Sequence, residues 1–139
     1  IIDFYNIEDP TKTKNVTDLA IVAEGMTTGI LFPSENKIQV PLQLTEDSTK
    51  FTFVLNSKNS NPALIFTDVL EFNYSRKTVY VSRACGYKTV FDLNNDSALP
   101  NPYVLNNDPE ARAGNWIKFL TVEKYNIENE NETHLKIYF

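Results

Sequence analysis

The sequence contains few of the residues on which catalytic and metal sites depend. Its 139 residues include one Cys, one His and one Met. A structural zinc site takes four ligands and a hydrolase triad places a His beside a nucleophile, and no such pattern surrounds His134. No Gly-rich phosphate loop is present, and no spacing pairs two carboxylates for glycoside cleavage. We therefore predict a non-enzymatic protein without catalytic residues, metal or cofactor.

One acidic segment approaches a calcium loop without completing it. Asp92, Asn94 and Asp96 have the alternating oxygen spacing, but Ser97 stands where the loop needs Gly and Tyr103 where it needs Glu. Because Asn and Asp also favour turns, we interpret this segment as a turn.

Basic residues are outnumbered by acidic ones, 13 against 18, which gives a net charge of −5. An acidic surface repels phosphate backbones, so we expect no nucleic-acid partner. No apolar run approaches the ~20 residues of a membrane-spanning helix. The sequence begins at Ile1 without Met or signal peptide, and we expect an upstream segment that carries targeting information.

The single Cys85 allows two interpretations. It is either a buried free thiol or the partner of a Cys upstream of Ile1. A reactive nucleophile is disfavoured, because no neighbouring base is identifiable.

Alternating apolar and polar residues dominate the chain, and helical periodicity is scarce. The clearest alternation runs over residues 37–44, where Pro41 predicts an edge strand or a bulge. The other expected strands are residues 2–7, 19–23, 30–32, 51–56, 70–75, 78–82, 87–93, 116–122 and 135–139. Turn residues such as Pro33–Asn36 and Glu46–Ser48 separate several of these runs. The exposed charge run 128–132 is expected at a hairpin tip.

Many short strands separated by turns predict an all-β, antiparallel two-layer β-sandwich of the immunoglobulin-like or transthyretin-like kind. We expect about seven to nine strands in one domain spanning residues 1–139. Residues 94–114 carry three Pro and little periodicity. They predict a long surface loop, with one helical turn possible at 109–113.

Four segments carry a resemblance to a known family: Phe72–Lys77, Tyr80–Thr89, Asn115–Lys118 and His134–Phe139. Together they resemble an uncharacterised lipoprotein family of the Bacteroidota, whose members are often encoded beside a predicted outer-membrane β-barrel protein. The resemblance implies a lipidated upstream Cys and an outer-membrane location, facing either the periplasm or the outside. It also implies that a second upstream Cys could pair with Cys85.

The same resemblance gives meaning to two short motifs. Asp47-Ser48-Thr49 and Asp96-Ser97-Ala98 resemble the O-glycosylation signal of that phylum. Both lie in expected turns, so Ser48 and Ser97 are candidate modification sites.

The first functional hypothesis is a lipid-anchored interaction subunit that docks on an outer-membrane β-barrel protein or assembly complex. Its expected contacts are edge strands, the 94–114 loop, and the aromatic residues Tyr103 and Trp116. The alternative is a glycan-binding sandwich, which predicts exposed coplanar aromatic rings. A hydrolase ranks third, because no residue pattern supports it.

Overall fold

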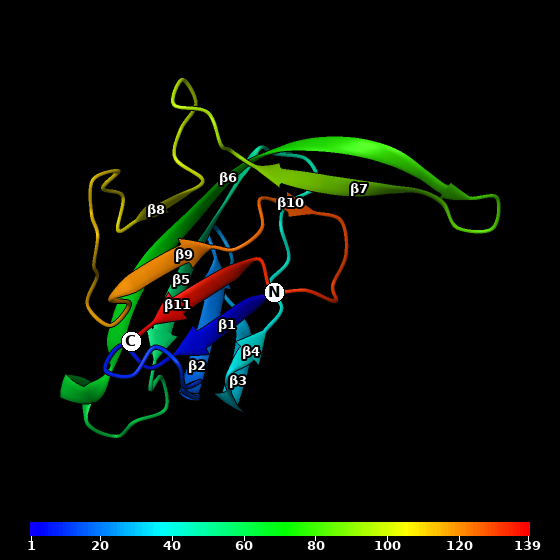
Figure 1. The fold of residues 1–139 in the computed structure, drawn as a ribbon. Coiled ribbons are helices and arrows are strands. Elements are labelled where there is room, and N and C mark those ends of the chain that lie inside the picture. The colour runs from blue at the N-terminus through cyan, green and yellow to red at the C-terminus, as the bar shows by residue number, and fades with distance from the viewer.

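Two β-sheets pack against each other in the computed structural model, which describes all 139 residues (Figure 1). The predicted all-β sandwich is therefore confirmed, with eleven strands in place of the expected seven to nine. The helical structure is confined to one 3₁₀ turn, η1 (Pro62–Leu64). No helix is long and apolar enough to cross a membrane. The strands are β1 (Ile2–Tyr5), β2 (Val16–Ala23), β3 (Ile30–Glu35), β4 (Lys37–Ile38), β5 (Ser48–Leu55), β6 (Phe66–Ser82), β7 (Gly86–Leu93), β8 (Tyr103–Leu105), β9 (Phe119–Val122), β10 (Asn126–Ile127) and β11 (Leu135–Tyr138).

The larger sheet has seven strands in the order β10-β7-β6-β5-β2-β3, with β8 paired to β6. The smaller sheet has the order β4-β1-β11-β9. Every pair is antiparallel except β1 with β11, where Ile2 lies opposite Leu135 in a parallel pair. The prediction of a purely antiparallel sandwich is therefore wrong at this one strand pair. The parallel pair arises because the two ends of the chain run side by side in the same direction.

The core lies between the sheets and contains 19 buried apolar residues. Strand β5 shows why the sequence folds this way: its residues alternate between buried and half-buried along the whole strand. Trp116 is only 4% exposed, and its ring packs against Phe4 and Phe139 from the two chain ends. Its Nε1 donates a hydrogen bond to the Phe53 carbonyl of the larger sheet at 3.1 Å. Trp116 therefore belongs to the core, and its expected role on an interaction surface is wrong.

A buried carboxylate fastens the segment before β9 to the larger sheet. Asp68 in β6 is fully buried, and its Oδ2 accepts hydrogen bonds from the backbone N–H groups of Trp116 and Ile117, both at 2.9 Å. Its Oδ1 accepts from the Asn115 N–H and from the Asn106 side chain. Gly114 passes so close that any Cβ there would collide with the Asp68 carboxylate. We call these four hydrogen bonds the Asp68 latch. They hold the segment before β9 against the core.

Several local predictions need correction. The strand expected over 37–44 is limited to β4, although Val40 and Leu42 do pack against the core. Pro33, expected in a turn, lies inside β3, which tolerates it because β3 is a sheet edge and a missing N–H costs nothing there. The 94–114 segment contains strand β8, and residues 109–110 form a turn without a helix. The two strands expected over 70–75 and 78–82 are one 17-residue strand, β6.

Candidate functional site

One feature projects from the sandwich: a two-stranded β-hairpin made of the outer halves of β6 and β7 (Figure 1). We call residues 76–90 the arm. The strands pair continuously from Tyr74 opposite Leu93 to Tyr80 opposite Tyr87, then shift register at a bulge before Ser82. β5 and β8 pair with β6 only up to Asn73, so neither extends alongside the arm.

The turn at the arm's tip depends on a glycine. Gly86 has φ +68°, a left-handed conformation that side chains disfavour. The Cys85 N–H donates to the Ser82 hydroxyl across the turn at 3.0 Å. The three-residue loop 83–85 followed by a left-handed Gly is a common hairpin connection. The sequence therefore specifies a tight end to the arm.

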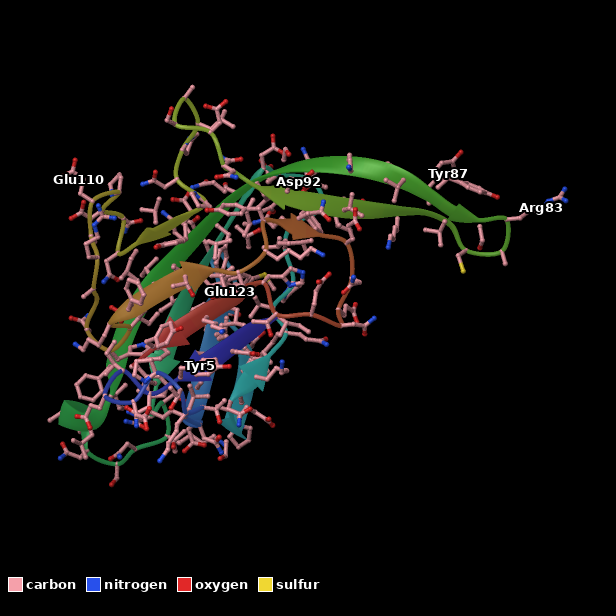
Figure 2. All side chains as sticks on the ribbon, in the orientation of Figure 1. Tyr5, Arg83, Tyr87, Asp92, Glu110 and Glu123 are labelled. Atoms are coloured by element: carbon pink, nitrogen blue, oxygen red, sulfur yellow. The ribbon has the colours of Figure 1, made fainter.

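The arm exposes large apolar side chains near its tip (Figure 2). Tyr80 is 61% exposed, Tyr87 70% and Val81 45%. The two tyrosine rings contact each other edge to face, with centroids 5.5 Å apart. Because opposite residues of a pair point to the same face, the tyrosines share the face of the buried Tyr74 and Leu93. The core-facing side of the larger sheet thus continues along the arm, beyond the residues that cover it.

Charge is segregated between the arm and the rest of the molecule. Residues 76–90 hold four of the thirteen basic residues and none of the eighteen acidic residues, so the remaining chain has nine basic and eighteen acidic residues. The arm's cations are Arg76, Lys77, Arg83 and Lys88. Arg76 is tied to the body, since its Nε donates to Asp47 at 2.8 Å. Lys88 also contacts the body, since its Nζ donates to the Glu128 carbonyl at 2.8 Å. Lys77 and Arg83 are exposed, and with Lys88 they form a positive projection on an acidic protein.

Both strands of the arm have an unpaired edge. β10 pairs with β7 only at Phe91 and Asp92, which leaves Gly86–Val90 without a second neighbour. An isolated two-stranded hairpin is marginally stable in water, and unpaired strand edges are templates for another strand. The arm's exposed rings, cations and free edges are therefore available to a partner.

The two ionisable residues that catalysis most often uses lie in different regions. Cys85 is exposed in the turn of the arm. The prediction of a buried thiol is wrong, because the turn extends beyond the sandwich. His134 is 2% exposed and lies beside Ile1, immediately before β11. No group of three or more His, Cys, Asp or Glu is placed to hold a metal ion.

The remaining candidate residues have distinct surroundings. Tyr103 is half-buried in β8, and its hydroxyl donates to the Leu120 carbonyl of the smaller sheet at 3.4 Å. Ser97 is exposed in a turn, as expected for a modification site. Ser48 is half-buried and begins strand β5 opposite Asn73, so it lies in a ladder instead of the expected turn.

A second group of aromatic rings lies on the outer face of the smaller sheet. Tyr5, Tyr138 and Phe119 are neighbours across β1, β11 and β9. Adjacent ring centroids are 5.7 and 5.6 Å apart, with interplanar angles of 34° and 47°. Phe119 is 49% exposed. The rings are tilted and do not form the flat platform that the glycan-binding hypothesis expects.

The arm is the feature that the sequence reasoning missed. Its strands were expected as separate elements, and their projection was not foreseen. A signal was present, however: no acidic residue occurs between Glu71 and Asp92, although acidic residues outnumber basic ones overall. Such a basic stretch with two Tyr in an acidic chain indicates a segment with its own function.

Comparison with protein families places this arrangement in a wider group. A model described as "Family of unknown function (DUF6452)" matches residues 17–139. The chain belongs to this family. The matched region begins within β2 and extends through β11, so it contains the arm, the Asp68 latch and every strand except β1. No curated protein and no solved structure matches the chain.

Proposed function

We propose that this domain is a non-catalytic interaction module that binds an acidic segment of a partner protein through its arm. The observation that carries the proposal is the arm itself: fifteen residues without an acidic side chain that expose Tyr80 and Tyr87 and leave strand edges unpaired. Exposed aromatic and arginine side chains are the residues enriched at binding hot spots. Positive charge favours association with an acidic partner and speeds the encounter.

The charges also favour a different protein over a second copy of this chain. Two arms that paired edge to edge would bring Lys77 and Lys88 of both copies together, and like charges on edge strands oppose such pairing. The bulge between Tyr80 and Ser82 further interrupts a regular ladder. An acidic strand that pairs with the β7 edge avoids both the like-charge repulsion and the bulge, which lies in β6.

The resemblance to Bacteroidota lipoproteins suggests the location of the domain and the kind of partner. The domain would be anchored by lipid to the outer membrane, on its periplasmic or outer side, and the partner would be a β-barrel protein or an assembly complex. Cys85 at the arm's tip would then be accessible to an upstream or partner thiol. Ser97 lies where a glycosylating enzyme could reach it.

Site-specific photo-crosslinking in the native envelope tests the proposal. A benzophenone side chain at position 87 should yield one discrete protein adduct. The same group at position 119, an exposed aromatic site on the other sheet, should not. Reversing the arm's charge with Arg83→Glu and Lys88→Glu should abolish the adduct, whereas Lys58→Glu with Arg112→Glu, exposed residues elsewhere, should leave it. Adducts only to lipid, or equal adducts at both positions, would refute docking through the arm.

Glycan binding is the second candidate: Tyr5, Tyr138 and Phe119 lie side by side on the outer face of the smaller sheet, although their rings are tilted and not coplanar. Aromatic rings stack on sugar faces, and this row offers three neighbouring rings. A saccharide array with the purified domain tests it, with Tyr138→Ser as the variant that should lose any signal. A flat response to the array would remove this candidate.

A further inference from the structure

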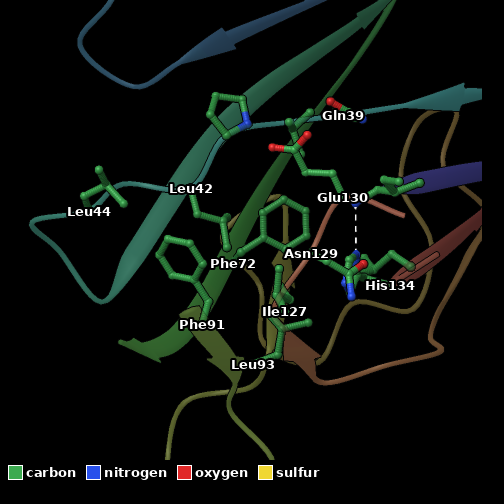
Figure 3. Close-up of a pocket in the computed structure, with 14 residues that line it drawn as sticks. Gln39, Leu42, Leu44, Phe72, Phe91, Leu93, Ile127, Asn129, Glu130 and His134 are labelled. Carbon is green, nitrogen blue, oxygen red and sulfur yellow. Dashed lines mark hydrogen bonds between the residues drawn. The ribbon is translucent and has the colours of Figure 1, made fainter. Parts of the chain in front are cut away.

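A cavity of about 500 Å³ opens between the sheets at the base of the arm (Figure 3). Nine of its fourteen lining residues are hydrophobic. One wall is the extended segment after β4, which directs Val40 and Leu42 inward. The opposite wall consists of Phe72, Phe91 and Leu93 of the larger sheet. The volume lies in the range of small-molecule sites, and seven of the nine hydrophobic lining residues are aliphatic.

One polar atom at this cavity has no partner within the protein. His134 lines the cavity and is 98% buried, and its Nε2 makes no hydrogen bond. The other buried atom without a hydrogen bond, Asp3 Oδ1, has the Lys37 ammonium 3.0 Å away and so is compensated. His134 is the unexplained case, because a buried unsatisfied polar group costs about 1–3 kcal/mol.

The protonation of the ring follows from its other contact. The Ile1 nitrogen lies 3.1 Å from His134 Nδ1 and can only donate, so Nδ1 accepts and the neutral ring carries its hydrogen on Nε2. Burial also lowers the pKa of His134, so the ring is neutral near pH 7. The cavity wall therefore contains an unsatisfied N–H donor, which calls for an oxygen acceptor.

We propose that this cavity binds a single aliphatic acyl chain that ends in a neutral carbonyl group. The aliphatic walls accept the chain, and the carbonyl oxygen takes the hydrogen of His134 Nε2 after a small shift of neighbouring side chains. A carboxylate is disfavoured, because Glu130 lines the same cavity and the molecule carries a net charge of −5. The inference is independent of the arm.

Calorimetric titration with N-methylalkanamides of six, eight and ten carbons tests the chain requirement. Affinity should rise about fourfold per methylene, the value expected for burying one CH₂. An affinity that does not rise from six to ten carbons would overturn the acyl chain in favour of a peptide, because amino-acid side chains are only about four or five carbons long. Decanoate should bind more weakly than N-methyldecanamide, and the reverse order would overturn the neutral carbonyl.

Two variants test the position of the site. His134→Phe should weaken N-methyldecanamide about three- to tenfold, the loss of one hydrogen bond, while binding of decyltrimethylammonium, which has no acceptor, stays unchanged. Val40→Trp should fill the cavity and abolish both, whereas Leu99→Trp, at an exposed site in the 94–101 loop, should affect neither. Unchanged binding in Val40→Trp would overturn the site even if His134→Phe does not fold.

Discussion

Asp68 is the residue whose replacement should damage the fold most directly. Its carboxylate accepts four hydrogen bonds, two of them from the buried backbone groups of Trp116 and Ile117. Asp68→Ala removes every acceptor, and the two buried N–H groups have no other partner. At about 1–3 kcal/mol for each unsatisfied group, the free energy of unfolding should fall by about 2–6 kcal/mol.

The milder variant Asp68→Asn keeps the size of the side chain and removes only part of its capacity to accept hydrogen bonds. Asparagine keeps one acceptor oxygen but directs an NH₂ group at backbone donors, so we expect roughly half of the alanine effect, about 1–3 kcal/mol. Urea unfolding followed by fluorescence is suitable, because Trp116 is the only tryptophan and lies beside the latch. A stable domain has only about 5–15 kcal/mol in total, so the Asn variant remains measurable if the Ala variant does not fold.

The control is Glu46→Ala, which removes an exposed carboxylate on the same molecule and should change stability by less than about 0.5 kcal/mol. An Asp68→Ala variant that is destabilised by less than about 1 kcal/mol would refute the reasoning, since two buried donors cannot lose their partners at so small a cost.

Three further predictions concern single residues. Because burial lowers the pKa of His134 below its ordinary 6.5, the unfolded chain binds a proton that the folded chain does not. Stability should therefore fall as the pH drops below about 6.5, and His134→Gln should reduce this loss between pH 7.5 and 5.5; equal pH slopes would contradict it. Gly86→Ala forces a side chain into φ +68° and should cost about 1–2 kcal/mol by urea unfolding, whereas Gly→Ala at a relaxed position would stabilise. Cys85 should react with a thiol reagent in the folded 139-residue chain as fast as in urea, and protection in the native state would contradict its exposed position in the arm.

The strands with the simplest packing could be predicted from sequence. β5 and β11 alternate strictly between core and surface, so the period of two identifies them. The same rule misjudged residues 37–44, because alternation reports which side chains face the core and not whether the backbone has a strand partner. Val40 and Leu42 face inward from a segment that is extended but unpaired beyond Ile38.

The elements that failed depend on contacts between distant parts of the chain. Trp116 is buried by Phe4 and Phe139, residues from opposite ends, and nothing near it in sequence indicates this. The sequence predicts two strands in place of β6 because residues 75–78 are polar and interrupt the apolar alternation. Strand β6 continues through these residues because its backbone groups form hydrogen bonds with β7. Such pairing requires no apolar side chains. The projection of the arm follows from the lengths of β5 and β8, which a local pattern does not contain.

Affinity capture with an arm-shortened variant tests the central claim most directly. In this variant, an Asn-Gly turn replaces residues 78–89, which removes the exposed rings but keeps β6 and β7 paired at their base. Wild type and variant, each with a linker and tag after Phe139, are extracted gently from native envelopes, and the co-purifying proteins are quantified by mass spectrometry. The account predicts one stoichiometric partner with the wild type and its loss with the shortened arm, although both domains are folded. Equal recovery of the same partner with both proteins would contradict it.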